Sequence, residues 1–276
     1  MANELITTEQ YSYEVMDKKL QHVLDCKQEL GEDYHPEFAS AKTPSGGLTV
    51  WSIKADKDDD DPEVVKTIEG VIIHAHRMNA YWSSPMGQGE NKQPDCRSFD
   101  GVTGTDSNGC KHSCVDCEHN RYGTGLNGRG KACKNSRVLY VLRPDDTLPI
   151  RLTLAPTGNK PYDKFVENLM IPKKRGQEPK RLKEIITAIG LKRVPGTASG
   201  TDYSVPTFTK IGELDDTSKV CVETYANELI AAATQQLQDE VSQQDAGQQD
   251  NEQDARQNTD QQGFVEVDVN DDKLPF

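Results

Sequence analysis

The feature that most constrains the fold of this chain is a stretch, residues 85–134, with almost no aliphatic side chains. Glycine, asparagine, cysteine and charged residues dominate it. Such a stretch cannot bury enough apolar surface to order itself, and core-less segments of this kind are usually stabilised by a bound metal or by disulfides. The sequence therefore predicts that residues 85–134 fold around their cysteines.

The cysteine spacing in this stretch is typical of a tetrahedral metal site. Two residues separate Cys114 from Cys117, so one turn can present both sulfurs to an ion, and structural zinc takes about four such ligands. Several glycines permit the tight turns that a core-less loop needs. We predict a structural Zn²⁺ held by Cys96, Cys114, Cys117 and Cys133. Cys110 and His112 lie close by, and either could replace one ligand.

Other uses of these cysteines fit the sequence less well. A redox pair at Cys114 and Cys117 would need the start of a helix in a βαβ unit, which this stretch does not offer. A zinc deaminase needs an H-x-E motif, and no glutamate follows His74 or His76 at that position; the HExxH motif of metalloproteases is also missing. We therefore expect no enzymatic activity. Cys26 and Cys221 lie on predicted helices and are expected to be buried thiols.

Hydropathy indicates that only part of the chain forms a core. Hydrophobic residues make up 34% of the sequence and the mean hydropathy is −0.75, whereas globular domains are about 45–50% apolar. No run approaches the roughly 18 apolar residues of a membrane span, and residues 1–10 lack a basic region followed by an apolar one. The odd number of cysteines favours a reducing compartment. We expect a soluble, cytoplasmic protein.

The net charge of −13 conceals a basic middle between two acidic ends. Residues 1–73 carry 16 acidic and 7 basic side chains, residues 74–211 carry 13 and 22, residues 212–233 carry 5 and 1, and residues 234–276 carry 11 and 2. This partition is typical of a nucleic-acid-binding protein with an acidic interaction tail. An ordinary mixed surface with a disordered acidic end would give the same counts.

Alternating and β-branched runs between turn residues predict a sheet of short strands within a core at residues 48–212. The predicted strands are 48–54, 64–78, 137–143, 149–154, 182–194 and 203–211. The two pairs 137–143 with 149–154 and 182–194 with 203–211 are expected to be hairpins, although 182–194 could also be a helix. We predict a mainly β (α+β) fold, an OB-like barrel with a zinc-knuckle insertion at residues 85–135; an antiparallel α+β sandwich is the alternative.

Helices are expected at the periphery of this core. Residues 1–47 comprise an N-terminal helix, from residue 8 to a cap at Gly31, and a lead-in. Further helices are predicted at 161–170 and within 213–237. The Gln-, Asn- and Asp-rich linker 238–263 has too little apolar surface to order itself and is expected to be disordered.

Aromatic and basic residues gather in and beside the cysteine-rich stretch, although aromatic residues are only 6% of the chain. Bases of a single strand stack on aromatic rings, while Lys and Arg neutralise phosphates, and neither interaction depends on nucleotide sequence. Tyr140, in mid-strand, is expected in the core, and Trp82 is expected to be exposed. The predicted single-stranded DNA-binding residues are Arg77, Tyr81, Trp82, Phe99, Arg121, Tyr122, Lys131, Lys134, Arg137 and Arg143.

The last residues, 264–276, combine acidic side chains with an apolar end. A ring and a carboxylate at one point suit a pocket with an apolar floor and a basic rim on a partner protein. The predicted partner-binding residues are Asp271, Asp272, Leu274, Pro275 and Phe276.

Two parts of the sequence resemble known families. The end DDKLPF is similar to the acidic tip DDDIPF of bacterial single-stranded-DNA-binding proteins, with Leu274 in place of Ile and Lys273 in place of one Asp. Residues 81–157 resemble zinc-containing single-stranded-DNA-binding proteins of phages and mobile elements, in PDCRSFDGVTG, CVDCEHNRYG, GKACKNSR and LYVLRPDDTLPIRLTLAPT. The resemblance implies an OB-like fold, a four-cysteine zinc knuckle, a bacterial host cell and a tip that recruits replication and recombination enzymes.

Taken together, the sequence predicts a non-catalytic protein that coats single-stranded DNA without sequence specificity during replication or recombination. Its tip is expected to recruit partner enzymes, and its acidic tail to compete with DNA for the basic surface. The alternative is a zinc-ribbon adaptor or regulator of a replication or mobile-element complex that mainly binds protein.

Overall fold

The computed structural model describes the chain in ranges separated by gaps. These are residues 16–31, 36–56, 59–83, 94–125, 128, 130–144, 146–173, 176–196 and 201–229. The chain divides into two units, Met1–Ala233 and Thr234–Phe276. The second unit, with the predicted linker and tip, lies outside the described residues, as do residues 8–15 and 230–237 of the two predicted terminal helices.

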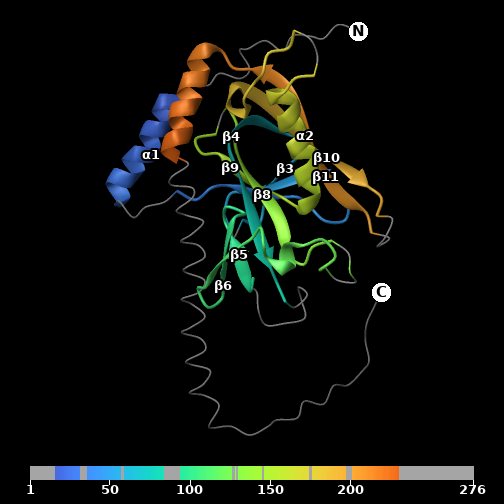
Figure 1. Ribbon diagram of the computed structural model, residues 1–276. Coiled ribbons are helices and arrows are strands. Elements are labelled where there is room, and N and C mark those ends of the chain that lie inside the picture. The colour runs from blue at the N-terminus through green and yellow to red at the C-terminus, as the bar shows by residue number, and fades with distance from the viewer. Residues whose placement is uncertain are drawn as a thin grey trace, which may run out of the picture. The chain divides into compact units, whose positions relative to one another are not determined.

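The strands of the described residues join into one sheet (Figure 1). They are β1 (Ser40–Lys42), β2 (Trp51–Lys54), β3 (Glu63–Val65), β4 (Ile68–Tyr81), β5 (Cys96–Ser98), β6 (Thr103–Asp106), β7 (Lys111–Ser113), β8 (Lys134–Leu142), β9 (Ile150–Leu154), β10 (Ile185–Val194) and β11 (Tyr203–Glu213). Neighbouring strands follow the order β3-β2-β1-β9-β8-β4-β5-β6-β7, and β10 pairs with both β4 and β11. The β1–β9 pair is parallel, whereas the other pairs are antiparallel.

The 14-residue strand β4 connects the parts of this sheet. One edge of β4 pairs with β8, from Val71 with Leu142 to Ala80 with Lys134. The other edge pairs first with β10 and then, at the far end, with β5. In Figure 1, β5 and β6 therefore lie beside the lower end of β4 and widen the sheet there.

One hydrophobic core fills the concave side of the sheet because inward side chains alternate with outward ones. On β9 the pattern is strict: Ile150, Leu152 and Leu154 are fully buried, and the two residues between them are half-buried. The core cluster consists of Ala41, Trp51, Ile53, Ile68, Ile72, Leu139, Val141, Ile150, Leu152, Leu154, Tyr162 and Ile189. The predicted core residue Tyr140 is also buried.

The two ends of the strand order approach each other through side chains. The buried indole of Trp51 on β2 donates a hydrogen bond to the carbonyl oxygen of Ile189 on β10 at 2.9 Å. The hydroxyl of Ser204 on β11 donates to the carbonyl of Leu48 at 2.7 Å. Within the described ranges no backbone ladder joins β2 or β3 to β10 or β11. The sheet is therefore curved but open.

Three α-helices accompany the sheet in the described residues. α1 (Met16–Leu30) ends at Gly31, whose φ of 105° is the left-handed conformation expected of a glycine C-cap. α2 (Asn159–Met170) follows β9, and a third helix occupies residues 216–229. Val222, Tyr225 and Leu229 of the third helix are buried.

The fold confirms the coarse prediction of a mainly β chain with few helices, including both predicted hairpins, β8–β9 and β10–β11. It differs in detail. The predicted strand 64–78 is two strands, β3 and β4, separated by residues 66–67. The lead-in contributes strand β1, and the cysteine-rich stretch contains β5, β6 and β7, which polar and glycine-rich sequence does not reveal. Cys26 is exposed, so its predicted burial is wrong; Cys221 is half-buried.

Candidate metal centre and nucleic-acid interface

We call residues 94–133, which contain β5, β6 and β7, the extension of the sheet. The four predicted zinc ligands come from its loops and strand ends. Cys96 begins β5 and pairs with Tyr81 at the end of β4. Cys114 follows β7, Cys117 precedes the short 3-10 helix η2 (Glu118–Asn120), and Cys133 precedes β8. The antiparallel pairing of β4 with β5, β5 with β6 and β6 with β7 thus brings together cysteines that are far apart in sequence.

The four cysteines line one small cavity of about 40 Å³. Gly104 on β6 lies close to two of these sulfurs: a Cβ atom there would lie 3.0 Å from the sulfur of Cys96 and 3.4 Å from that of Cys114. Cys114 and Cys133 are buried, and Cys96 and Cys117 are half-buried. All four are free thiols. The cavity is therefore a shared space lined by sulfur.

Residues around the cavity hold the loops in place. The amide of Asn120 donates to the carbonyl of Cys114 at 2.6 Å, and the backbone N–H of Cys133 donates to the carbonyl of His119 at 2.8 Å. The ring of His119 stacks on Tyr81, with centroids 4.0 Å apart and planes 8° apart. Sequence reasoning missed His119 and Asn120; their position directly after the Cys114 and Cys117 pair was the available signal.

Of the two alternative ligands, only one lies at the cavity. His112 lines it, with its Nε2 3.3 Å from the sulfur of Cys96. Cys110 is exposed in the turn after β6, and it is not among the residues that line the cavity. His112 is therefore the alternative that the geometry retains.

Two thiols of the cavity, Cys96 and Cys133, have raised pKa values. Burial raises the pKa of Cys133 to about 11, and the neighbouring thiols of Cys114 and Cys117 add to this rise. The pKa of Cys96 is raised for the same reasons, burial first. Over the described ranges, no group of three or more His, Cys, Asp or Glu side chains is arranged so that it could hold a metal ion as it stands.

The opposite face of the extended sheet carries a row of cations. Lys134 pairs with Ala80, Ala80 with Arg97, Arg97 with Thr105, and Thr105 with Lys111. Directly paired residues of neighbouring strands point to the same face, so these five side chains share one face, and Cys96, next to Arg97, points to the other. We call Lys134, Arg97 and Lys111 the cation row. Lys134 and Lys111 are exposed, and Arg97 is half-buried.

An aromatic ring lies at one end of the cation row. The ammonium group of Lys134 lies 5.2 Å from the ring centroid of Trp82, within the range of a cation–π contact. Trp82 follows β4 and is half-buried, not exposed as predicted. The site can therefore offer a ring and positive charges side by side.

The other predicted DNA-binding residues lie at several places around the extension. Arg121 and Tyr122 are exposed after η2, and Tyr122 keeps 83% of its surface accessible. Lys131 is exposed and donates to the side-chain oxygen of Asn120 at 3.0 Å. Phe99 follows β5 and is half-buried, and Arg77 is exposed on β4, where its side chain packs against Gly101.

Two predicted DNA-binding arginines are engaged by carboxylates. Arg137 forms an ion pair with Asp163 of α2 at 2.7 Å, and its guanidinium lies 4.3 Å from the ring centroid of Tyr162. Arg143 forms ion pairs with Glu63 at 2.8 Å and Asp146 at 2.6 Å, which raise its pKa. These contacts give both arginines a role in holding elements together.

Comparison of the chain with protein-family profiles, with curated proteins and with solved structures finds no match. In the part of the chain that the structure describes, every helix is too short or too polar to cross a bilayer. The predicted partner-binding residues 271–276 lie outside the described residues.

Proposed function

We propose that this protein binds single-stranded DNA without sequence specificity and that it has no catalytic role. The observation that carries this proposal is the cation row with Trp82 at its end, on the face of the sheet that does not carry the cysteines. Lys and Arg side chains neutralise phosphates, while an unpaired base stacks on the indole. The bases of a duplex are paired and stacked on one another. A duplex would therefore contact the cation row but would not stack a base on Trp82.

The order of the elements supports an OB-like assignment. The segment β4, β8, β9, α2, β10, β11 has strand neighbours β9-β8-β4-β10-β11, with α2 between the third and fourth strands. OB folds are partly open five-stranded barrels that bind oligonucleotides with the second and third strands and the connections between strands one and two and between four and five. In this chain the cysteine-rich extension is the connection between strands one and two.

The donor set supports a structural Zn²⁺ bound by Cys96, Cys114, Cys117 and Cys133. Four thiols around one cavity match the commonest structural zinc site, and about 40 Å³ is roomy enough for an ion. Binding would draw the sulfurs together and favour their thiolate forms. The ion would brace the extension that carries the cation row. His112, close to Cys96, would orient that ligand.

The acidic segment 264–276 completes the proposal as the part that recruits partner enzymes. Its acidic side chains and its apolar residues Leu274 and Phe276 suit a basic, apolar pocket on another protein. Deleting residues 274–276 is expected to abolish capture of replication or recombination enzymes.

Tryptophan fluorescence during titration with poly(dT) tests DNA binding. Of the two tryptophans, Trp51 is fully buried and cannot stack on a base, so quenching reports on Trp82. We expect quenching that weakens steeply as salt rises, because cations on the protein replace counterions of the strand. Trp82→Ala should abolish the quenching and weaken binding about fivefold or more, which is the loss of one stacked base.

Duplex DNA of the same length is the matched control ligand, and it should bind more weakly than the single strand. Equal, weak binding of both ligands with no change in Trp82 fluorescence would contradict the proposal. It would favour the zinc-ribbon adaptor that mainly binds protein.

A further inference from the structure

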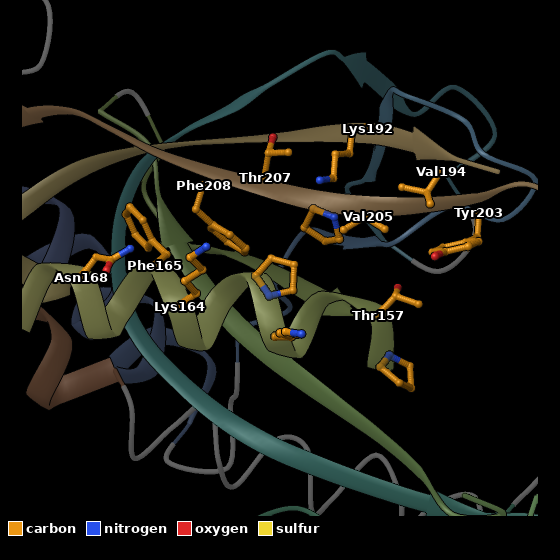
Figure 2. Close-up of a pocket in the computed structure, with 14 residues that line it drawn as sticks. Thr157, Lys164, Phe165, Asn168, Lys192, Val194, Tyr203, Val205, Thr207 and Phe208 are labelled. Carbon is orange, nitrogen blue, oxygen red and sulfur yellow. The ribbon is translucent and has the colours of Figure 1, made fainter. Parts of the chain in front are cut away.

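A second basic surface lies between α2 and the β10–β11 hairpin. This groove has a volume of about 800 Å³ and is open to solvent (Figure 2). Figure 2 shows Phe165 and Lys164 on the helix facing Phe208 on the strands, with Tyr203 and Val194 toward the other end. None of its residues is among the predicted DNA-binding residues.

The walls of the groove are positively charged. Lys160 and Lys164, one helical turn apart, come from α2, and Lys192 comes from β10. No Asp or Glu lines the groove, and none of the three lysines forms an ion pair with another described residue.

Carboxylates beside the groove are engaged elsewhere. Asp163 is paired with Arg137 at 2.7 Å. Asp202 is paired with Arg193, and Glu167 is paired with Lys173 at 3.3 Å. The charge offered to a ligand is therefore positive.

The floor of the groove is aromatic and apolar. Phe165 and Phe208 stack with ring centroids 5.6 Å apart and planes 25° apart. Both are only half-buried, and Tyr203 keeps 40% of its surface accessible. Pro161 and Pro206 add rigid apolar surface. Aromatic rings together with lysines are the combination with which proteins bind single strands.

The start of α2, which forms one wall of the groove, is bonded to β8. The side-chain amide of Asn159, at the start of α2, donates to the carbonyl of Asn135 at 2.7 Å. Asn135 is the neighbour of Lys134 in the cation row, and Asn159 is the neighbour of Lys160 in the groove. The start of α2 is therefore attached to β8 beside Lys134, whose own side chain points to the opposite face of the sheet.

We infer that the groove between α2 and the β10–β11 hairpin is a second binding site for single-stranded DNA. Lys160, Lys164 and Lys192 contact phosphates, and bases pack on Tyr203 and on the Phe165–Phe208 pair. This inference rests on the proposed function. An acidic, apolar peptide would satisfy the same charges, but the accessible ring of Tyr203 and the stacked Phe165–Phe208 pair beside the lysines favour the strand.

The test compares salt dependence of poly(dT) binding in the full chain and in the double variant Lys160→Gln/Lys164→Gln. Each lost phosphate contact lowers the slope of log Kobs against log salt by about 0.7, so we expect a decrease of about 1.4. The matched control Lys54→Gln/Lys66→Gln also removes two lysines, outside both surfaces, and should leave the slope unchanged. Tyr203→Ser should weaken binding about fivefold or more at unchanged slope.

Ultraviolet crosslinking of poly(dT) to the unaltered chain gives a second measurement, and crosslinks at Phe165, Tyr203 or Phe208 support the inference. If the unaltered chain binds poly(dT) while the lysine variant keeps the same slope and no crosslink falls in the groove, the inference is overturned and the proposed function stands. If the unaltered chain does not bind, the proposed function fails. If the variant loses only binding of a synthetic peptide of residues 264–276, the groove is a peptide site and the inference is overturned.

Discussion

At the scale of single residues, Gly104 illustrates how one position controls the cysteine cavity. Its backbone lies directly beneath the sulfurs of Cys96 and Cys114, and the imidazole of His112 lies 3.3 Å from the place of its missing Cβ. Three potential metal ligands, Cys96, Cys114 and His112, thus lie close to a position where any side chain would contact them. Glycine is the one residue type without such a side chain. The constraint is steric, since Gly104 is not among the glycines with positive φ.

Gly104→Ala is therefore expected to weaken zinc binding. The added methyl group must push the sulfurs of Cys96 and Cys114 aside, and such overpacking costs about 1–3 kcal/mol. Competition with a chromophoric chelator should show a zinc affinity about tenfold lower than that of the unaltered chain. Gly109→Asn is the control, because no atom lies near Gly109 and Asn tolerates its positive φ of 79°. Equal affinities of the Gly104 variant and the unaltered chain would contradict this placement of the thiols.

At the scale of elements, Arg137 connects β8 to α2. Only 11% of the Arg137 side chain is exposed, and it lies over Tyr162 while bonding Asp163. Since α2 also forms one wall of the groove, Arg137 holds that wall in place through Asp163 and Tyr162. Arg143, directly after β8, is likewise engaged by carboxylates, those of Glu63 and Asp146.

Arg137→Ala should lower stability and leave the salt dependence of DNA binding unchanged. A charged hydrogen bond and a cation–π contact at a buried site together contribute about 2–3 kcal/mol, and removing the arginine loses both. Chemical denaturation should report this loss, while the slope of log Kobs against log salt stays the same. A slope lower by about 0.7 would instead show that Arg137 contacts a phosphate. Lys131→Ala, at an exposed position, serves as the comparison for stability.

At the scale of the whole molecule, the sheet and its extension are stabilised in different ways. The core cluster contains no residue between β4 and β8. In residues 94–133 the buried hydrophobic residues are Cys114 and Cys133 alone, among the described positions. The main sheet is thus ordered by apolar burial, and the extension has little besides its hydrogen bonds and its thiols.

Removal of zinc should consequently unfold the extension and spare most of the sheet. Structural zinc supplies on the order of 10 kcal/mol of local folding free energy in small motifs, and the extension has no core to replace it. Hydrogen exchange after chelation under reducing conditions should show lost protection in residues 94–133 and retained protection in β9 and in the first half of β4. Elemental analysis should find one zinc per chain beforehand. Uniform exchange with and without chelator would contradict a structural metal.

Short-range features of this protein follow from the sequence by itself. The hairpins β8–β9 and β10–β11, helix α2 and the C-cap at Gly31 each depend on residues close together in the chain, so periodicity and turn residues predict them. The same holds for the pairing of Cys114 with Cys117 across one turn. Strand β1 and the strands of the extension are not predicted from the sequence. They are three or four residues long and polar, so they are defined by their hydrogen bonds to neighbouring strands and not by a local pattern of apolar residues.

Only the tertiary structure decides which side chains share a surface. Lys134, Arg97 and Lys111 align through the register of four consecutive strand pairs, and a shift of one residue in any pair would turn a cation to the other face. Arg143 meets Glu63 80 residues away, so counting charges along the chain cannot tell an engaged arginine from an available one. The groove depends in the same way on two separate elements packing together. Local periodicity fixes what each segment becomes, whereas register and long-range packing fix which charges a ligand meets.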